Sequence, residues 1–493
     1  MKHLPHSSEV VVVGGGPAGA SVASLLAARG HVVSVAAREI DDRRGIAESL
    51  PPSTRKVMAA VGILEAVERS GACRNIGNAV WWGSEAGRIE DFRAPDEQSG
   101  LQIWRPTFDR LLREHAVSGG VTWKTGNVTS VRVEDDRVET TMVRRDGGTE
   151  TLVSAFVIDA SGRSAVLGRA VRRPLTDIRT HAWIGCWTHT ATALATDTRT
   201  LVETTDDGWV WSVPVSDRER CVTVMVDPDR TSFACDGSLE RRYLGELAKT
   251  RHIGGLLDGA ELNRVWGCDA SLYDTSDSGG PRQLIVGDAG SFIDPMSSFG
   301  VKKALTSAWM GAAVARTCLT DPDLEAAARE LFVSREREAW ATSVRRSADY
   351  AREAAAHHDT PFWNARSGMA AGVAPVADRA SVSAAVLKAF DDLRARPAVR
   401  LRPRPDVRFA WLPAFRGHGV ALERALVSDA FERPTRFIEN VDLARLVELA
   451  AGQRQVGELF DGYCAHEVPV PLPSFLRALS VLVAGRVLEP ADC

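Results

Sequence analysis

The residues whose types and spacing point most directly to chemistry are three glycines near the N-terminus. Gly14, Gly16 and Gly19 form a GxGxxG pattern that also contains Pro17 and Ala18. In this pattern the first glycine allows a tight turn, the second lets a pyrophosphate approach the backbone, and the third lets a helix pack closely on a strand. The N–H groups at the start of that helix favour phosphate groups. The pattern therefore predicts a dinucleotide-binding site.

The elements around the glycines are those that a dinucleotide site requires. Residues 10–13 are a continuous run of valines, which is typical of a strand buried on both faces of a parallel sheet. Residues 20–29 have a helical pattern that ends at Gly30, and residues 32–35 supply a second strand. This order predicts a Rossmann-like α/β domain, and a chance glycine-rich loop is the alternative.

The position that should hold the adenosine ribose departs from the usual pattern. An acidic residue is expected at the end of the second strand, about 20 residues beyond the glycines. That position falls here on Ala36-Ala37, which is followed by Arg38 and Glu39. Either Glu39 reaches back to the ribose or the ribose is held in another way. Arg38 and Glu39 are therefore both candidate cofactor-binding residues.

Three later segments predict strand or helix ends of the kind that line a nucleotide site. Residues 157–163 are an apolar strand followed by the small-residue turn Asp-Ala-Ser-Gly-Arg. Residues 284–289 are a second apolar strand, which ends in Gly-Asp-Ala and precedes a helix from about residue 300. Residues 103–109 open a helix whose apolar positions recur at helical spacing. The motif order is thus GxGxxG, R-x-x-F-D, D-A-S-G-R, and then G-D-A with D-P and a glycine.

This motif order resembles that of FAD-dependent monooxygenases of the hydroxybenzoate-hydroxylase-like group, over roughly residues 9–340. The resemblance implies an α/β fold with a Rossmann-like FAD-binding domain and a β-sheet substrate domain. It also implies that Asp288 hydrogen-bonds the flavin ribityl chain, for which a simple turn residue is the alternative. The N–H groups near Gly300 and Val301, at a helix start, would face the flavin pyrimidine ring and stabilise negative charge. The other cofactor-binding residues that the motifs imply are Arg105, Gly287 and Pro295.

A second signature lies at residues 208–214, which resemble the W-x-W-x-I-P motif of flavin-dependent halogenases with Val213 in place of isoleucine. Strand alternation places Trp209 and Trp211 on one face, so two rings that simply fill core are an alternative. In that family the motif is interpreted as a wall between substrate and flavin. The segment that begins at Glu48 also resembles the family. Glu48, Trp209 and Trp211 are therefore the candidate catalytic residues.

The groups that handle halide in halogenases are replaced in this sequence. The resemblance implies a lysine within residues 74–83, at the position of Asn75, and a neutral amide cannot do that lysine's work. Phe299 stands where family members tend to carry serine or threonine. Lys56 and Lys302 are the possible substitutes, and an exposed helical lysine is the favoured interpretation of each. The sequence therefore predicts a halogenase-like scaffold that oxygenates rather than halogenates.

The C-terminal third predicts a further domain. Extended segments at 407–412, 419–426 and 435–438 precede helical segments at 441–451, 454–464 and 472–486. Short strands with three helices resemble a winged-helix-like α+β module, similar to those that bind precursor peptides, and a dimerisation or packing domain is the alternative. The predicted organisation is a FAD-binding domain at 1–355, with substrate-domain segments inserted at about 75–105 and 173–280, a helical connection and linker at 356–400, and the module at 401–493.

Composition excludes several other classes of protein. Sixty basic and 64 acidic residues give a net charge of −4, which argues against nucleic acid or an anionic membrane as a partner. No apolar run approaches the ~18–20 residues of a membrane span, and the N-terminus has no signal-peptide pattern. The eight cysteines form no CxxC pair, so we expect reduced cytoplasmic thiols and no metal site.

Together these features resemble the maturases that oxygenate a tryptophan residue of a partner polypeptide during tryptophylquinone biogenesis. One alternative is a halogenase or hydroxylase of a small or carrier-bound aromatic. Another is a non-catalytic flavin- or peptide-binding subunit. No second GxGxxG is evident, so the reducing equivalents would come from a separate flavin reductase or from transiently bound NAD(P)H.

Overall fold

The structure is a computed structural model, and it divides into two compact units, Met1–Ala374 and Pro375–Cys493. It describes residues 8–42, 45–84, 86–92, 99–175, 178–189, 197–229, 237–275, 278–373, 384–396, 398–428, 431, 433–452 and 454–491. None of the helices in these ranges is both long enough and apolar enough to cross a lipid bilayer.

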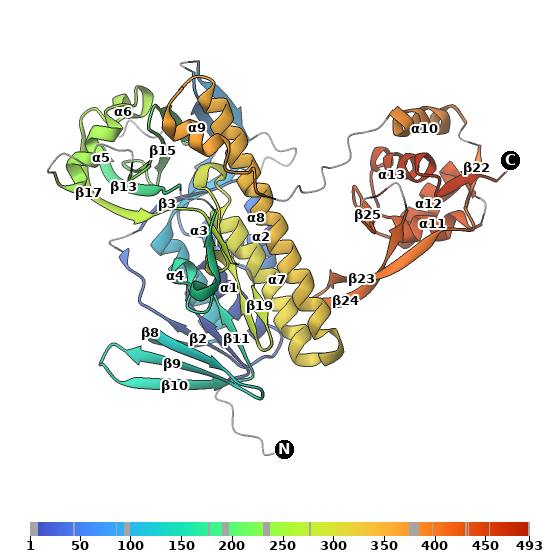
Figure 1. Cartoon of the computed structure of the whole chain (residues 1–493), viewed down its shortest axis with the longest axis horizontal. Helices are drawn as coiled ribbons and strands as arrows, with labels where there is room; N and C mark the ends of the chain where they lie inside the picture. Colours follow the sequence, from blue (N-terminus) through green and yellow to red (C-terminus); the bar gives the residue numbers. More distant parts are fainter. Residues whose placement is uncertain are drawn as a thin grey trace. The chain divides into compact units, whose positions relative to one another are not determined.

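The first unit is built around an eight-stranded sheet whose central strands are parallel (Figure 1). The valines of the central strand β1 are buried, as expected for a strand covered on both faces. Helices α1 (Pro17–Ala27), α4 (Arg105–Ser118) and α7 (Gly300–Thr320) lie in contact, α1 with each of the other two. In spatial order the strands are β10 (Thr149–Ser154), β9 (Val138–Arg144), β8 (Thr122–Val133), β2 (Val33–Ala37), β1 (Val10–Val13), β11 (Phe156–Asp159), β20 (Gln283–Ile285) and β19 (Gly279–Gly280).

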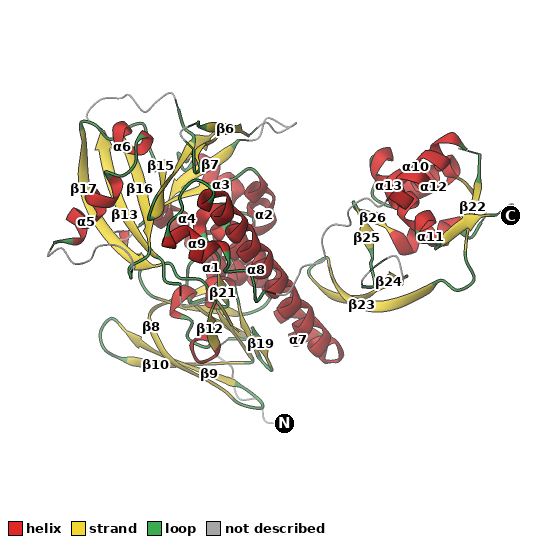
Figure 2. Cartoon of the chain, turned by 45° about the horizontal axis from the view of Figure 1, so that its top comes forward, coloured by secondary structure: helices red, strands yellow, loops and turns green. Residues whose placement is uncertain are grey.

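A seven-stranded sheet forms the second layer of this unit, and Figure 2 shows its strands side by side. One face packs against α5 (Leu239–Leu247) and α6 (His252–Leu256). The other carries Trp209, Trp211 and Trp266, and we call it the tryptophan face. In order the strands are β17 (Ala260–Asp269), β13 (His181–His189), β16 (Glu219–Val226), β15 (Gly208–Pro214), β14 (Thr200–Thr205), β5 (Gly77–Trp81) and β6 (Arg88–Asp91).

Short elements join the two large sheets. A small sheet of β3 (Ala47–Leu50), β7 (Gly100–Trp104) and β4 (Cys73–Asn75) leads directly into α4 and β5. A second small sheet contains β12 (Arg172–Pro174), β18 (Tyr273–Thr275) and β21 (Ser291–Phe292). The remaining helices of the unit are α2 (Ser53–Val61), α3 (Leu64–Arg69), α8 (Glu325–Ala355) and α9 (Pro361–Ser367), and α9 packs on α8.

The second unit has its own apolar core, to which strands and four helices contribute within the described residues. The three expected helical segments occur as α11 (Leu443–Ala450), α12 (Val456–His466) and α13 (Leu472–Ala484). The segment expected to connect the domains, 356–400, is divided, because α9 packs in the first unit whereas α10 (Ala384–Ala395) packs on α13. The winged-helix-like assignment stays a prediction. The strands are β22 (Arg400–Pro403), β23 (Arg408–Arg416), β24 (Gly419–Val427), β25 (Phe437–Ile438), β26 (Val441–Asp442), β27 (Arg454–Gln455) and β28 (Leu488–Pro490).

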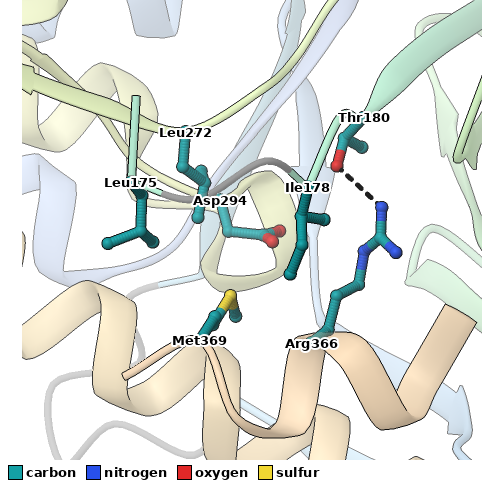
Figure 3. A pocket seen from close by; sticks show the side chains of 7 residues that line it. All are labelled: Leu175, Ile178, Thr180, Leu272, Asp294, Arg366 and Met369. Atoms are coloured by element: carbon teal, nitrogen blue, oxygen red, sulfur yellow. Dashed lines mark hydrogen bonds between the residues drawn. The ribbon is translucent and has the colours of Figure 1, made fainter. Parts of the chain in front are cut away.

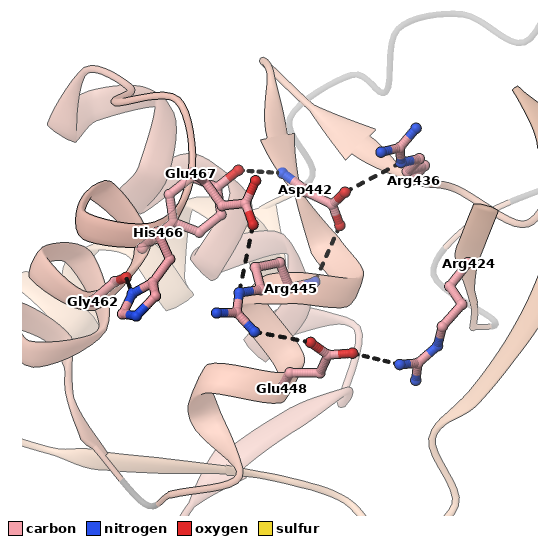
Figure 4. A network of polar contacts seen from close by, with 9 residues as sticks. Arg424, Arg436, Asp442, Arg445, Glu448, Gly462, His466 and Glu467 are labelled. Atoms are coloured by element: carbon pink, nitrogen blue, oxygen red, sulfur yellow. Dashed lines mark hydrogen bonds and ion pairs between the residues drawn. The ribbon is translucent and has the colours of Figure 1, made fainter. Parts of the chain in front are cut away.

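A polar network fixes the start of α11 in this second unit (Figure 4). The Asp442 side chain accepts from the Arg445 N–H at 3.1 Å and from Arg436 Nε at 3.2 Å. The Tyr463 hydroxyl on α12 accepts from the Asp442 N–H at 2.7 Å. An aspartate at this position satisfies a free N–H of the first helical turn, so the network orders α11 against α12.

Candidate functional site

Of the three glycines in the GxGxxG pattern after β1, two are required by the protein's own packing and one is not. A Cβ on Gly14, whose φ is +102°, would lie 2.4 Å from the Ala160 carbonyl oxygen, and one on Gly19 would lie 1.9 Å from that of Gly14. A Cβ on Gly16 would meet only Arg105 Nη2, at 3.5 Å. The space before Gly16 is therefore open, as the approach of a pyrophosphate demands.

The start of α1 and the Gly-Asp turn after β20 lie against each other. Gly16 is the N-cap residue of α1 and Pro17 follows it, so the first N–H groups of the helix have no side-chain cap. Gly287 has a φ of +62°, and a Cβ there would lie 2.8 Å from Ala18 Cβ. Two motifs about 270 residues apart in the sequence thus meet at the carboxyl edge of the parallel strands.

Arg105 is held beside this turn by two carboxylates. Its Nε donates to Asp109 at 2.8 Å, and its Nη1 donates to Glu48 at 2.9 Å. Although burial alone would lower the pKa of Arg105, Asp109 and Glu48 raise it above its ordinary value. Burial raises the pKa of Glu48, and Arg105 opposes that shift. Glu48 is therefore oriented as a partner of Arg105 rather than as a free base, and Asp109, which the sequence analysis missed, was signalled by its i,i+4 spacing from Arg105.

Asp288 carries a polar atom without a hydrogen bond. Its Oδ1 is buried and has no hydrogen-bond partner, although it forms an ion pair with Lys303 Nζ at 3.6 Å. Lys303 Nζ instead donates to the backbone oxygens of Gly287, at 3.0 Å, and Ser291. Buried acceptors without a partner are uncommon, so this oxygen is available to a hydroxyl donor of a ligand. Lys303 was also missed, because nothing in the local sequence links it to the Gly-Asp turn.

The segment before α7 presents backbone N–H groups. Pro295 opens a short 3₁₀ turn (Pro295–Ser297), and Phe299, the N-cap residue of α7, supplies no side-chain cap. The first N–H groups of α7, including those of Gly300 and Val301, have no partner within the helix and lie at its positive end. Lys302 is not an exposed helical lysine as expected, because it is half-buried and donates to Ser53 at 2.9 Å.

On the tryptophan face, Trp209 and Trp211 point to the same side, as strand alternation predicts. Their ring centroids are 5.1 Å apart, with 27° between the ring planes. Trp209 is buried and its centroid lies 6.4 Å from that of Trp82, whereas Trp211 is half-buried. Trp209 therefore fills core, and Trp211 presents part of its ring outward.

Asn75 is a structural junction in this protein. It is fully buried, and its Nδ2 donates to Ser49 at 3.0 Å and to Thr200 at 3.2 Å. Its Oδ1 accepts from the Gly77 N–H at 3.0 Å. The amide thus ties β4 to β3 and β14, and its hydrogen-bonding capacity is used within the protein.

The residues proposed for the ribose make other contacts. Arg38 donates to Ser164 at 3.0 Å, in the turn after β11, and Glu39 pairs with Arg145 at 3.0 Å on the surface. Neither contact directs Glu39 toward the glycine turn. The role of Glu39 on a ribose stays a prediction.

A small pocket lies beside α9, and none of its lining residues belongs to the glycine turn (Figure 3). Asp294 points into it beside Met369, while Arg366 donates to Thr180 at 3.0 Å. Burial raises the pKa of Asp294 to about 6, although the Met296 N–H donates to its carboxyl. The other lining residues are Leu175, Ile178 and Leu272.

These features fit FAD. The open space at Gly16 accommodates a pyrophosphate, and the Asp288 oxygen that lacks a hydrogen bond suits a ribityl hydroxyl. The start of α7 suits the electron-accepting end of a flavin. The chain belongs to the FAD binding domain family, whose model matches residues 7–313. Within it, the chain falls in the superfamily of FAD-dependent halogenases and monooxygenases, with FAD as cofactor.

Two curated relatives are similar to part of the chain. The chain is 27% identical to tryptophan 2-halogenase from Chondromyces crocatus over 67% of this chain and 65% of that protein, so it spans less than two thirds of that relative. It is 28% identical to a Pseudomonas fluorescens chlorinase of 1H-pyrrole-2-carbonyl peptidyl-carrier protein, over 62% of this chain and 74% of that one.

Two solved structures share the fold over nearly the whole chain. The flavin-dependent halogenase CmlS superposes with a TM-score of 0.76 at 24% identity, over 99% of this chain and 97% of its own. The peptidyl tryptophan dihydroxylase QhpG, essential for tryptophylquinone cofactor biogenesis, gives 0.67 at 22% identity, over 97% and 99%.

Proposed function

We propose that this chain is a flavin-dependent monooxygenase that hydroxylates an electron-rich aromatic ring, a tryptophan residue of a partner polypeptide, during the formation of a quinone cofactor. The observation that carries the proposal is the set of hydrogen bonds that Asn75 makes within the protein. At the position where the halogenase resemblance implies a lysine, the chain has a buried amide bonded to Ser49, Thr200 and Gly77. An amide without charge does not capture or present an oxidised halogen.

Two lysines at the start of α7 are engaged within the protein, and a third, on α2, is exposed. Lys302 donates to Ser53 and lies 4.9 Å from the centroid of the Phe299 ring. Lys303 is bound to backbone carbonyls beneath Asp288. Lys56 is exposed on α2. These contacts support an oxygenase rather than a halogenase.

Each site residue has a proposed role toward FAD. Gly14, Gly16, Pro17, Ala18 and Gly19 shape the turn that receives the pyrophosphate, and Arg105, oriented by Glu48 and Asp109, supplies a cation beside it. Asp288 accepts from the ribityl chain, and Gly287 allows its turn to pack on α1. The N–H groups that follow Pro295, at Gly300 and Val301, stabilise negative charge on the ring.

The reaction itself comes from the cofactor. Reduced FAD supplies the two electrons that let O₂ transfer one oxygen atom to the ring and release the other as water. The contribution of the chain is to hold the ring and exclude water. Trp211 is placed to contact a substrate ring because it is half-buried on the tryptophan face, with Trp209 packed behind it. A separate flavin reductase is the proposed source of electrons.

The polypeptide part of the proposal has two supports. The fold neighbour QhpG is a peptidyl tryptophan dihydroxylase. In the second unit, the hairpin β23–β24 exposes Trp411 at 64% and Leu422 at 45% on the same face. Exposed apolar side chains on a sheet face are suited to hold a polypeptide remote from the reacting ring.

The test supplies reduced FAD, O₂ and chloride or bromide with three substrates: free tryptophan, tryptophan-containing peptides, and the tryptophan-bearing polypeptides encoded beside this chain. We expect additions of about 16 Da per oxygen on a polypeptide, since the cofactor delivers single oxygen atoms. Replacing Trp411 and Leu422 with alanine should lower turnover and leave FAD bound, while Leu387→Ala, an exposed control on α10, should not.

A halogenase is the second candidate, because both curated relatives described above are halogenating enzymes. A chlorinated or brominated product in the same assay would establish it and refute the oxygenase. Bound FAD that is reoxidised without any product would instead favour a non-catalytic flavin- or peptide-binding subunit.

A further inference from the structure

Two cysteines face each other on the tryptophan face. Cys186 on β13 is directly opposite Cys221 on β16 in the antiparallel register. Directly opposite residues in such a pair have Cα atoms about 4.5–5.5 Å apart. A disulfide requires Cα atoms about 4.4–6.8 Å apart, so the backbone already holds this pair at bonding separation.

The two thiols have unequal surroundings. Cys221 is 2% exposed, whereas Cys186 is half-buried and accepts a hydrogen bond from Arg264 Nε at 3.5 Å. Hydrogen bonds from Cys221 and Arg264 lower the pKa of Cys186, against burial and the charge of Glu219, while the pKa of Cys221 is raised. Cys186 is thus the more acidic thiol of the pair and the one that would react first, and Cys221 is the thiol that would resolve it.

The pair lies next to the proposed reaction space. Cys221 is opposite Val213, two residues beyond Trp211 on β15. The Arg264 guanidinium lies 5.2 Å from the centroid of the Trp104 ring, and Trp104 immediately precedes Arg105. The pair therefore lies on the same face of the sheet as Trp211, the residue proposed to contact the substrate ring.

We propose that Cys186 and Cys221 are a peroxide-responsive pair that closes into a cross-strand disulfide. The Cys186 thiolate attacks H₂O₂ and becomes a sulfenic acid with release of hydroxide. The Cys221 thiol then attacks that sulfur, an S–S bond forms, and water leaves. H₂O₂ is the oxidant, and it forms whenever reduced flavin reacts with O₂ without transferring oxygen. The inference goes beyond the proposed function and does not depend on it.

The test treats the full-length, FAD-bound protein with H₂O₂ and follows its intact mass. We expect a loss of about 2 Da, reversed by dithiothreitol, and a peptide map that links Cys186 to Cys221. Cys186→Ser should abolish the mass loss. Cys221→Ser should leave a sulfenic acid on Cys186 that dimedone traps. Cys268→Ser is the matched control, because Cys268 is exposed on the adjacent strand β17 and should not affect closure.

Three results would overturn the proposal. One is a peptide map in which Cys186 and Cys221 stay reduced at peroxide concentrations that oxidise Cys268. Another is a disulfide that joins other cysteines. The third is stepwise gain of two or three oxygens on wild-type Cys186 without a linked peptide. Because the peptide map uses the wild-type protein, the result stands even if a serine variant fails to fold.

Discussion

The carboxyl edge of the eight-stranded sheet and the tryptophan face of the seven-stranded sheet differ in the chemical groups that form them. The first uses backbone N–H groups and close approaches at Gly14, Gly19 and Gly287. The second uses large side chains, such as Trp209 and Trp211, on strands that come from distant parts of the sequence. A cofactor common to many proteins can be held by backbone geometry, whereas a particular substrate requires side chains.

This difference implies that the two regions will respond differently to substitution. At the carboxyl edge, a single Cβ obstructs either the fold or the cofactor. On the tryptophan face and on the elements that support it, single changes should leave FAD bound and alter stability or the substrate. Four substitutions test that contrast.

The largest effect is expected at Gly16. Gly16→Val should weaken FAD binding by more than about 100-fold, because its side chain would occupy the pyrophosphate's space. The apoprotein should keep its melting temperature, since a Cβ there meets only Arg105 Nη2. Absorbance of bound flavin and thermal melting of the apoprotein measure the two quantities.

The matched control is Gly245→Val, at an exposed position on α5 with no neighbour within 4 Å, which should retain FAD. Gly19→Val should destabilise even the apoprotein. If the Gly16→Val protein still bound flavin stoichiometrically, the pyrophosphate would not be bound at this turn.

The next effect is expected at Arg105. Arg105→Met should weaken FAD binding about 10- to 100-fold, because a charge-assisted contact worth roughly 1.5–3 kcal/mol is lost. Glu48→Gln should have a smaller effect, since it keeps an acceptor for Arg105. Equal losses in both variants would make Glu48 more than a positioning residue, and Arg105→Lys should restore part of the binding.

On the small sheet that joins the two regions, Asn75→Ala should lower the free energy of unfolding by about 3 kcal/mol, since it removes three hydrogen bonds to residues on β3, β5 and β14. FAD affinity should change little. Denaturant unfolding and flavin titration separate the two. Asn75→Lys should be at least as destabilising, and a gain of halogenated product from that variant would contradict the structural role given to Asn75.

The smallest effect is expected at Asp294, which belongs to the Asp-Pro motif before α7 and lines the pocket beside α9. Because its pKa is raised to about 6, the folded state holds the proton more tightly than the unfolded state. Stability from this group is therefore greatest at low pH and is lost as pH rises through about 6. Asp294→Asn should gain on the order of 1–2 kcal/mol relative to wild type between pH 4.5 and 7.5.

Thermal melts across that pH range test this expectation. Asp258→Asn, on the surface, serves as the control. A wild-type-minus-variant difference that does not change with pH would contradict the direction of the shift.

How far the sequence predicts each region follows from the same contrast. The valines of β1, the GxGxxG turn and the three C-terminal helices are local patterns, and the structure contains them. The pairing of Cys186 with Cys221 is set by strand register over 35 residues, and the bonds of Lys303 to the Gly-Asp turn are set by tertiary packing. Neither leaves a periodic signal. The place of α10 was missed for a similar reason, because its apolar residues match a partner, α13, that lies far along the chain.

The hydroxyl of Thr200 joins the two regions. On β14 of the seven-stranded sheet, its Oγ1 lies within hydrogen-bond distance of Ser49, Asn75 and Gln102, at 2.8, 3.2 and 3.2 Å. Gln102 lies on β7, three residues before Arg105. If binding of FAD or of the substrate moves these hydrogen bonds, the two binding equilibria are coupled. Such coupling is reciprocal, so a substrate that raises the affinity for FAD must itself be bound more tightly by the FAD-loaded protein.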